Sequence, residues 1–213
     1  GICTLTVDLN GTWYKDITVQ LWTSDGAAMK WAYGNQHGAI RTYTVPSGIY
    51  DLKLVQGSQV YVVDDLDCSN GCNAGDVIET LTVDLNGTWL RDITVQLYRD
   101  GGSLIWSAGN QHGAIRTYNV LPGIYDVKLV QGDEVLEVAN VNCTAGNCAA
   151  GDVISDLGID LSGTWLRDVT VQLKTFDGKL IWSAGNQHGA ERHYNVLKGT
   201  YDLILLEGPK SFD

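Results

Sequence analysis

The chain has 213 residues, with 14 lysines and arginines, 25 aspartates and glutamates, and a formal net charge of −11. Such acidity argues against nucleic acid or an anionic membrane as the main partner, because both require a basic surface. Hydrophobic residues make up 44% of the chain, enough to build buried cores, and no long apolar run predicts a membrane span. The chain begins at Gly1-Ile2-Cys3 with no Met and no signal-like segment, so we expect a processed product.

Three internal repeats organise the sequence. The run Leu5–Trp13 recurs unchanged at Leu81–Trp89 and in altered form at Leu157–Trp165, which is a period of 76 residues. A second run, Gly34-Asn-Gln-His-Gly-Ala39, returns in both later units. Repetition at a fixed period indicates repeated structural units. We therefore predict domains over residues 1–75, 76–151 and 152–213, the third being incomplete.

Apolar residues alternate with polar ones inside each unit. In Ile17–Leu21 and Tyr50–Leu54 every second residue is apolar, which is the pattern of a half-buried strand. Asn-Gly, Asp-Gly and Ser-Gly pairs between these stretches favour turns. We expect strands in the first unit near residues 4–9, 16–22, 28–33, 39–45, 49–55, 59–66 and 76–80. The predicted fold class is all-β, with three tandem antiparallel β-sandwiches. A single closed barrel or trefoil built from the three units is the alternative.

Part of each unit resembles a known kind of repeat. Thr42–Leu54 and Tyr118–Leu129 each place an apolar residue and a turn before a tyrosine and an alternating strand. This pattern is similar to that of the immunoglobulin-like and prealbumin-like β-sandwich repeats (Cna-B or carboxypeptidase-regulatory type) of secreted microbial proteins. The resemblance implies a stalk, adhesin or fibre module.

Cysteines recur near the end of the first and second units. Cys68 and Cys72 lie four positions apart, and Cys143 and Cys148 lie five apart, in short glycine-containing loops. We predict a disulfide in each pair that limits bending where one sandwich meets the next; reduced or differently paired thiols are the alternative. Disulfides indicate an extracellular or cell-surface location. Cys3 is left over, either as a free thiol or as a link to a neighbouring subunit.

Three asparagines, Asn10, Asn86 and Asn142, fit the acceptor pattern for N-glycosylation. A glycoprotein is one interpretation of this pattern. The other is that Asn-Gly at the first two positions is only a hairpin turn, since the third unit has Ser162 in place of asparagine. Both interpretations place these residues on the surface.

The repeated Asn-Gln-His segment is the candidate ligand-binding or contact loop. Each copy offers an indole, two amides and an imidazole near an arginine, groups that can stack on and hydrogen-bond a carbohydrate, and three copies would form an avid lectin. The alternative is that the tryptophans pack in the core while the loop side chains hold backbone groups. The candidate residues are Trp31, Asn35, Gln36, His37, Trp106, Asn110, Gln111, His112, Trp182, Asn186, Gln187 and His188.

Catalysis is not expected from this sequence. A hydrolase needs a nucleophile beside a base or a pair of carboxylates, and neither recurs beside the histidines. A metal site of four soft ligands does not fit a single cysteine pair in each loop. We therefore predict no enzyme activity, no cofactor, no metal, no nucleic-acid partner and no membrane insertion.

The third unit lacks the residues that supply a closing strand and a cysteine loop in the other two. A missing strand leaves an apolar groove and unpaired backbone groups that accept strand addition. We predict that the amino-terminal segment of another copy fills this groove, giving a head-to-tail homopolymer. The alternatives are that Lys210–Phe212 fills the gap within the chain, or that the sequence is a fragment of a longer array. The predicted subunit-contact residues are Ile2, Cys3, Leu5, Val7, Leu206 and Phe212.

Overall fold

The computed structural model describes residues 1–11, 13–87, 90–163 and 165–212. All regular elements of this described part are β-strands, and it contains no helix long and apolar enough to cross a membrane. We call the units 1–75, 76–151 and 152–213 repeat one, repeat two and repeat three. Repeat one contains β1 (Ile2–Asp8), β2 (Ile17–Thr23), β3 (Met29–Gln36), β4 (Ile40–Pro46), β5 (Ile49–Gln56), β6 (Gln59–Asp67) and β7 (Cys72–Asn73).

The later repeats follow the same order of strands. Repeat two contains β8 (Glu79–Asp84), β9 (Ile93–Arg99), β10 (Leu104–Gln111), β11 (Ile115–Val120), β12 (Gly123–Gln131), β13 (Glu134–Cys143) and β14 (Cys148–Ala149). Repeat three contains β15 (Ile154–Asp160), β16 (Val169–Thr175), β17 (Leu180–Gln187), β18 (Glu191–Leu197), β19 (Tyr201–Glu207) and β20 (Lys210–Phe212).

Two sheets face each other in repeat one. One has the antiparallel order β3-β2-β5-β6, and the other has the order β4-β1-β7. Leu5 of the second sheet and Leu21 and Leu52 of the first are 0% exposed and belong to one cluster. Because alternate residues of both sheets point into this shared core, the unit is a β-sandwich. Repeat two has the same pair of sheets, β10-β9-β12-β13 and β11-β8-β14. The predicted fold class of tandem β-sandwiches is therefore confirmed.

The first six strands predicted for repeat one match β1–β6, but the strand predicted at 76–80 is wrong. Residues 74–78 are not in a strand, and β8 begins only at Glu79. This linker is extended because it packs against repeat one, where Ala74 is 7% exposed and Val77 is 1% exposed. Its backbone also follows the sheet, since the Ala74 amide donates to the Thr6 carbonyl at 3.0 Å. The linker is thus part of the repeat that precedes it.

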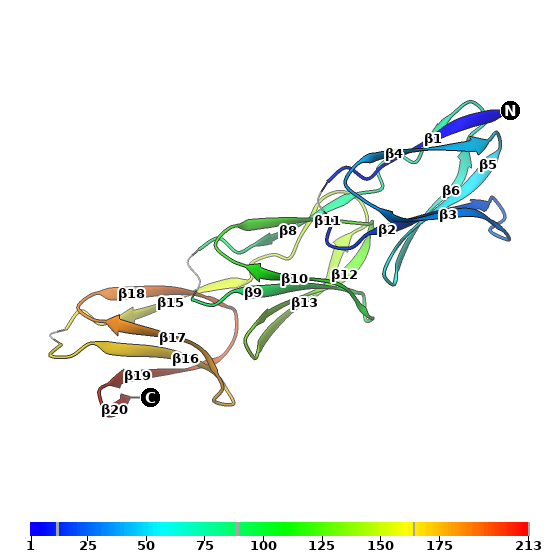
Figure 1. Cartoon of the computed structure of the whole chain (residues 1–213). Helices are drawn as coiled ribbons and strands as arrows, with labels where there is room; N and C mark the ends of the chain where they lie inside the picture. The colour runs from blue at the N-terminus through cyan, green and yellow to red at the C-terminus, as the bar shows by residue number, and fades with distance from the viewer. Residues whose placement is uncertain (12, 88–89, 164, 213) are drawn as a thin grey trace.

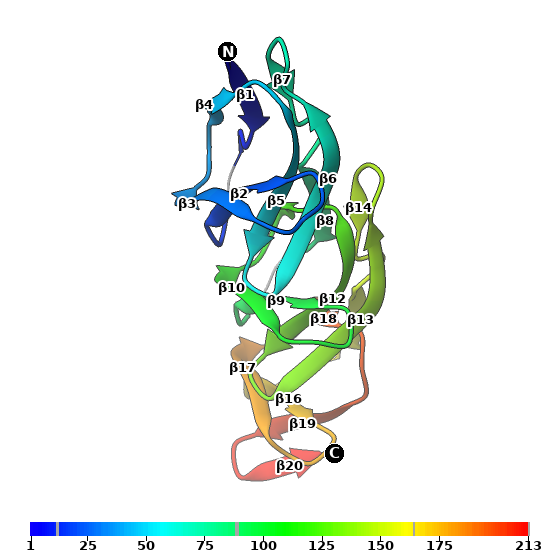
Figure 2. The ribbon, with the colours of Figure 1, turned by 90° about the vertical axis from the view of Figure 1, so that its right-hand side faces the viewer.

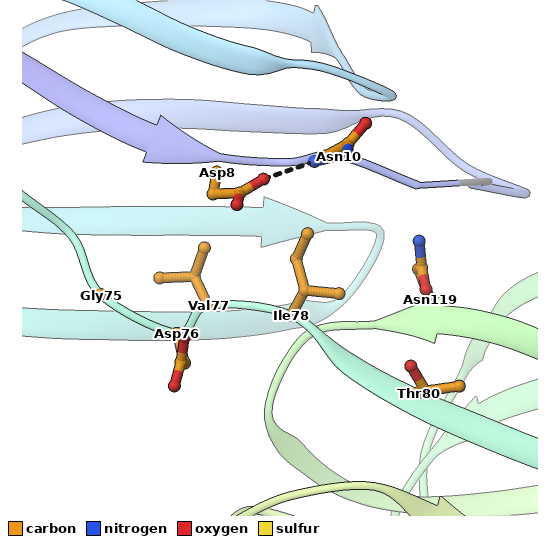
Figure 3. A pocket seen from close by; sticks show the side chains of 8 residues that line it. All are labelled: Asp8, Asn10, Gly75, Asp76, Val77, Ile78, Thr80 and Asn119. Atoms are coloured by element: carbon orange, nitrogen blue, oxygen red, sulfur yellow. Dashed lines mark hydrogen bonds between the residues drawn. The ribbon is translucent and has the colours of Figure 1, made fainter.

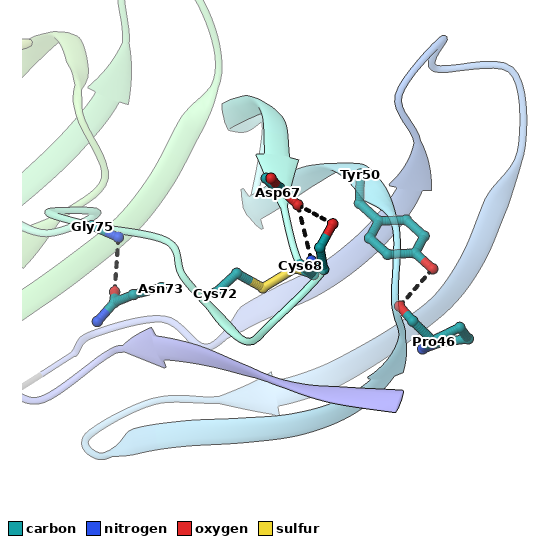
Figure 4. The surroundings of a disulfide bond; sticks show 8 residues. Pro46, Tyr50, Asp67, Cys68, Cys72, Asn73 and Gly75 are labelled. Carbon is teal, nitrogen blue, oxygen red and sulfur yellow. Dashed lines mark hydrogen bonds between the residues drawn. A yellow bond between two sulfur atoms is a disulfide. The ribbon is translucent and has the colours of Figure 1, made fainter. Parts of the chain in front are cut away.

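The disulfides close the sharp reversal before each linker. Cys68 joins Cys72 and Cys143 joins Cys148, with Cα–Cα distances of 4.8 and 5.2 Å. The prediction that these bonds sit where one sandwich meets the next is wrong for Cys68–Cys72. Figure 4 shows this disulfide beside β1, where Cys72 pairs with Leu5, and the Cys68 amide donates to the Gly48 carbonyl at 2.8 Å. β7 then runs parallel to β1 and leads the chain back toward repeat two.

The three sandwiches lie in a row, with the two termini at opposite ends (Figure 1). The view turned by 90° shows the same order, with repeat two between its neighbours (Figure 2). Each repeat therefore meets only the repeats next to it in sequence, as in repeat proteins whose units stack on their neighbours.

A leucine from each later repeat completes the core of the repeat before it. Leu121, in the turn between β11 and β12, is 0% exposed and belongs to the core cluster of repeat one. Leu197 occupies the same position in repeat three and belongs to the core of repeat two. The hydroxyl of Tyr125 donates to the Leu121 carbonyl, and that of Tyr201 donates to the Leu197 carbonyl. These bonds hold the turn that carries each leucine. Repeat one has the exposed Pro46 at this position.

Truncation of Leu121 should destabilise repeat one although the residue belongs to repeat two. Removing a fully buried leucine side chain leaves a cavity and costs about 2–5 kcal/mol. In Leu121→Ala, hydrogen exchange should therefore speed up in β1–β6 as well as in β11 and β12. Leu166→Ala is the matched control, because Leu166 is 99% exposed and its loss should change stability by less than about 0.5 kcal/mol. Faster exchange confined to repeat two would show that Leu121 does not support the preceding core.

Candidate functional site

The Asn-Gln-His loop has the same internal hydrogen bonds in each repeat. In repeat one the Tyr43 hydroxyl donates to Gln36 Oε1 at 2.9 Å, and Gln36 Nε2 donates to the Gly34 carbonyl at 2.8 Å. Burial raises the pKa of Tyr43 to about 12, so its hydroxyl stays protonated and donates at neutral pH. Gln111 with Tyr118, and Gln187 with Tyr194, repeat the bond at 2.9 and 2.8 Å. Each glutamine amide is thus used within its own loop.

The histidines of this loop are also paired. His37 Nδ1 lies 2.6 Å from Asp16, His112 Nδ1 lies 2.8 Å from Asp92, and His188 Nδ1 lies 2.7 Å from Asp168. The backbone carbonyl of each histidine accepts from an arginine guanidinium, at 3.1, 3.0 and 3.3 Å for Arg41, Arg116 and Arg192. Half of each histidine side chain still faces solvent, with 53–54% exposed.

The asparagines of the loop have a left-handed backbone conformation, and two of its three tryptophans lie in the cores. Asn35, Asn110 and Asn186 all have φ near 56°, the left-handed conformation that asparagine adopts more readily than most residues. Trp106 and Trp182 are 4% and 5% exposed and lie in the cores of their repeats. Trp31 is only partly buried. The predicted loop residues are thus adjacent in space, but the indoles of repeats two and three face inward.

A tyrosine packs against the loop tryptophan in repeats one and two, but it comes from a different repeat in each case. Tyr14 of repeat one lies across the junction, with its ring centroid 5.3 Å from Trp106 and 5.2 Å from Tyr118. In repeat one the equivalent ring is Tyr33 of the same repeat. Its centroid lies 5.0 Å from that of Trp31 and 5.3 Å from that of Tyr43. The later repeats have Ala108 and Ala184 where repeat one has Tyr33. Trp31, Tyr33 and Tyr43 form an aromatic cluster in which Tyr33 is 51% exposed.

A polar pocket lies at each junction between repeats. The first is lined by Asp8, Asn10, Gly75, Asp76, Val77, Ile78, Thr80 and Asn119. Figure 3 shows Asp8 and Asn10 on one side, the linker residues Val77 and Ile78 below them, and Asn119 of repeat two facing Asn10. The equivalent pocket of the second junction contains Asp84, Asn86 and Asp152. There Lys198 Nζ donates to Asp152 at 2.7 Å, a contact that the Pro122 of repeat two cannot make.

The predicted glycosylation residues are exposed, but two of them lie at these junctions. Asn10 and Asn86 line the pockets, and their backbone N–H groups donate to the carboxylates of Asp8 and Asp84 at 2.9 Å, as in Asx turns. A side chain on the glycine after Asn10 would lie 1.6 Å from the side-chain amide of Asn119, and the positive φ of Gly11, 145°, also favours glycine at this close approach of repeat two. Asn142 is exposed in β13. The threonines of the first two acceptor patterns, 12 and 88, lie outside the described residues, and modification stays a prediction.

The amino-terminal residues predicted as subunit contacts are part of repeat one itself. All seven residues of β1 pair with β4, and Leu5 and Val7 are 0% exposed. The segment predicted as the donor strand thus supplies core side chains and sheet hydrogen bonds to its own repeat. Ile2 is 77% exposed, and Cys3 is a partly buried free thiol.

The carboxy-terminal contact residues lie in the last hairpin. Leu206 pairs with Ser211, and Phe212, which is 52% exposed, pairs with Leu205. Lys210–Phe212 thus adds a short strand to repeat three from within the chain, as one of the alternatives expected.

Sequence reasoning missed the residues that join the repeats, Tyr14, Leu121 and Leu197. The signal available for the two leucines was the run Val-Leu before the glycine turn of repeats two and three, against Val-Pro in repeat one. Among the described residues, no group of three or more His, Cys, Asp or Glu side chains is placed to hold a metal ion.

The sequence matches no protein-family profile and no curated protein sequence. Among solved structures, the chain is similar to the Bacillus anthracis TIE protein at 14% identity and a TM-score of 0.24, with 99% of this chain and 48% of that chain covered. It is also similar to the tip fimbrial protein Mfa3 of Porphyromonas gingivalis with C-terminal truncation, at 7% identity and a TM-score of 0.30, with 92% and 100% covered. The chain spans about half the length of the first of these structures.

One histidine outside the loop should titrate at a raised pH. His193 Nδ1 lies 2.8 Å from Asp156, and this hydrogen bond, aided by the carboxylate charge, raises the pKa of His193. The folded-state pKa therefore exceeds the unfolded value of about 6.5, so the pair stabilises the fold below that pH and the contribution is lost as pH rises through the folded pKa. NMR titration should show a lower pKa for His193 in Asp156→Asn. Asp100→Asn, in repeat two, should leave it unchanged. An unaltered titration in Asp156→Asn would contradict the pairing.

Proposed function

We propose that this chain is a non-catalytic structural module of an extracellular surface stalk or filament. The main support for this proposal is that Leu121 and Leu197 each belong to the core of the preceding repeat. Because a shared core cannot bend without exposing apolar surface, the row of sandwiches resists hinging at its junctions. A stiff row of small domains suits a spacer that carries load or displays a partner at a distance.

Further contacts across the junctions support the proposed stiffness. Gln59 Nε2 donates to the Pro122 carbonyl at 3.2 Å, and Arg91 Nη1 donates to the Ile181 carbonyl at 2.9 Å. The linkers are anchored by buried side chains, as Val77 and Val153 are each 1% exposed. The two disulfides favour an oxidising, extracellular compartment.

Electron microscopy of source cells tests the proposed role. Gold-labelled antibody raised against the folded chain should mark the cell surface or fibres projecting from it. Pre-immune serum is the control for background labelling. Label confined to the cell interior would overturn the proposal.

Carbohydrate binding is the second candidate function, and the aromatic cluster of repeat one favours it. Trp31, Tyr33 and Tyr43 offer partly exposed ring faces, whereas Trp106 and Trp182 are buried. A sugar-binding role would therefore use one site in repeat one rather than three equivalent loops.

A glycan array with two variants separates the versions of this candidate. If the aromatic cluster binds sugar, Tyr33→Ala should abolish binding while His112→Ala, in the loop of repeat two, leaves it unchanged. Loss on His112→Ala alone would instead favour the repeated loop. No binding by the unaltered chain at millimolar sugar would exclude both versions.

A further inference from the structure

One edge strand of repeat one presents apolar side chains to solvent. β6 is the last strand in the order β3-β2-β5-β6, so within the described residues its outer side pairs with no strand. On the solvent face of β6, Val60 and Val62 are 48% and 36% exposed. An exposed apolar edge strand is a template for pairing with another chain unless charge or a bulge blocks it. The edge of repeat one is therefore a candidate contact surface.

Repeat two has a charge at the equivalent place on its edge. Glu137 of β13 corresponds to Val62 of β6, and the Glu137 carboxylate lies 3.2 Å from Nζ of Lys128 on β12. The corresponding lysine of repeat one, Lys53, lies opposite Val62 and has its ammonium group over the Trp22 ring, 4.1 Å from the ring centroid. A charged side chain at a sheet edge opposes pairing, because pairing would remove the charge from water. Repeat two thus blocks the kind of contact that repeat one allows.

The hairpin between β5 and β6 determines which backbone groups face the edge. Gln56 pairs with Gln59 across a two-residue turn. Residues that flank such a turn exchange hydrogen bonds, and bonded and non-bonded pairs alternate from there along the two strands. Counted from this first pair, the N–H and C=O groups of Val60 and Val62 point away from β5, toward the outer side of β6.

Two copies of β6 fit each other in one antiparallel register. When Tyr61 lies opposite the partner's Tyr61, Val60 lies opposite the partner's Val62, and the two residues exchange both of their backbone hydrogen bonds. On the solvent face the same register packs the valine side chains of the two strands against each other, which removes apolar surface from water. The edge of repeat one is thus complementary to itself.

The same register brings opposite charges together. Counted outward from Tyr61, Asp64 lies opposite the partner's Ser58. The Ser58 carbonyl accepts from Nη1 of Arg99, an exposed residue of repeat two, at 3.5 Å. In the described part of the chain, no carboxylate lies within salt-bridge distance of Arg99. Each copy therefore offers an exposed carboxylate where the other has a guanidinium group, and such complementarity favours specific association.

We propose that the β6 edge of repeat one is a side-by-side contact surface whose partner is the same edge of a second copy. The two β6 strands run in opposite directions and join their larger sheets into one continuous sheet. Because both copies use the same surface, the contact closes at a dimer and does not propagate. It connects two rows of sandwiches laterally, which goes beyond the proposed stalk role and does not rest on it.

A substitution taken from repeat two tests this contact. Analytical ultracentrifugation of the full 213-residue chain over a range of concentrations should show a reversible dimer. Val62→Glu keeps the fold, because the new carboxylate can pair with Lys53 as Glu137 pairs with Lys128. It should raise the dimer dissociation constant by roughly tenfold or more, since the carboxylate would lose water at the edge. Val135→Glu is the matched control: it adds the same charge to the edge of repeat two, at a 50% exposed position, and should leave the dissociation constant unchanged.

A charge reversal tests the register. Asp64→Arg and Arg99→Asp should each weaken the dimer, because each places like charges together across the contact. The double variant restores opposite charges and should return the dissociation constant to near that of the unaltered chain. A monomer at millimolar concentration, a dimer that Val62→Glu leaves unchanged, or a double variant as weak as the single variants would overturn the proposal. None of these results decides the surface role, because that role is tested by the location of the protein on cells.

Discussion

The sharing of one leucine between neighbouring cores is the constraint on which the rest of this architecture depends. Leu121 and Leu197 reach out of their own repeats, and their turns are held by the hydroxyls of Tyr125 and Tyr201. A sandwich of this size has little apolar surface to bury by itself. Borrowing a side chain from the next unit enlarges each core and fixes the relative position of the two units in the same contact.

The end of repeat one that carries Pro46 differs from the ends of repeats two and three that carry Leu121 and Leu197. Pro46 stands in place of the shared leucine, and Lys30 stands where Ile105 and Ile181 are buried. Tyr33 covers Trp31 from within the repeat, as Tyr14 covers Trp106 from outside it. These exchanges replace contacts between units by contacts within one unit.

Much of the fold follows from the period of the sequence, whereas the joints between units do not. Alternation in Ile17–Leu21 and the turn pairs were sufficient to predict β1–β6, because a strand with one wet face has a period of two. The spacing of Cys68 and Cys72 likewise indicated their bond, but not which end of the sandwich it occupies. The role of Leu121 and the capture of β1 by β4 depend on contacts distant in sequence, which a local pattern does not contain. For the loop, the sequence identified the right neighbours, but not that the amides and imidazoles were already paired with groups of their own repeat.

The parallel pairing of β7 with β1 determines how the row would respond to tension. A pull on the start of β1, opposed by a pull on the segment that follows β7, drives these two strands past each other along their length. The hydrogen bonds between them are then loaded in shear, all at once, rather than opened one after another. The disulfide between Cys68 and Cys72 prevents the loop between them from being stretched out under tension. Extension of repeat one would therefore require its sandwich to unfold, and its mechanical lifetime would be governed by an unfolding rate rather than by the elasticity of a linker.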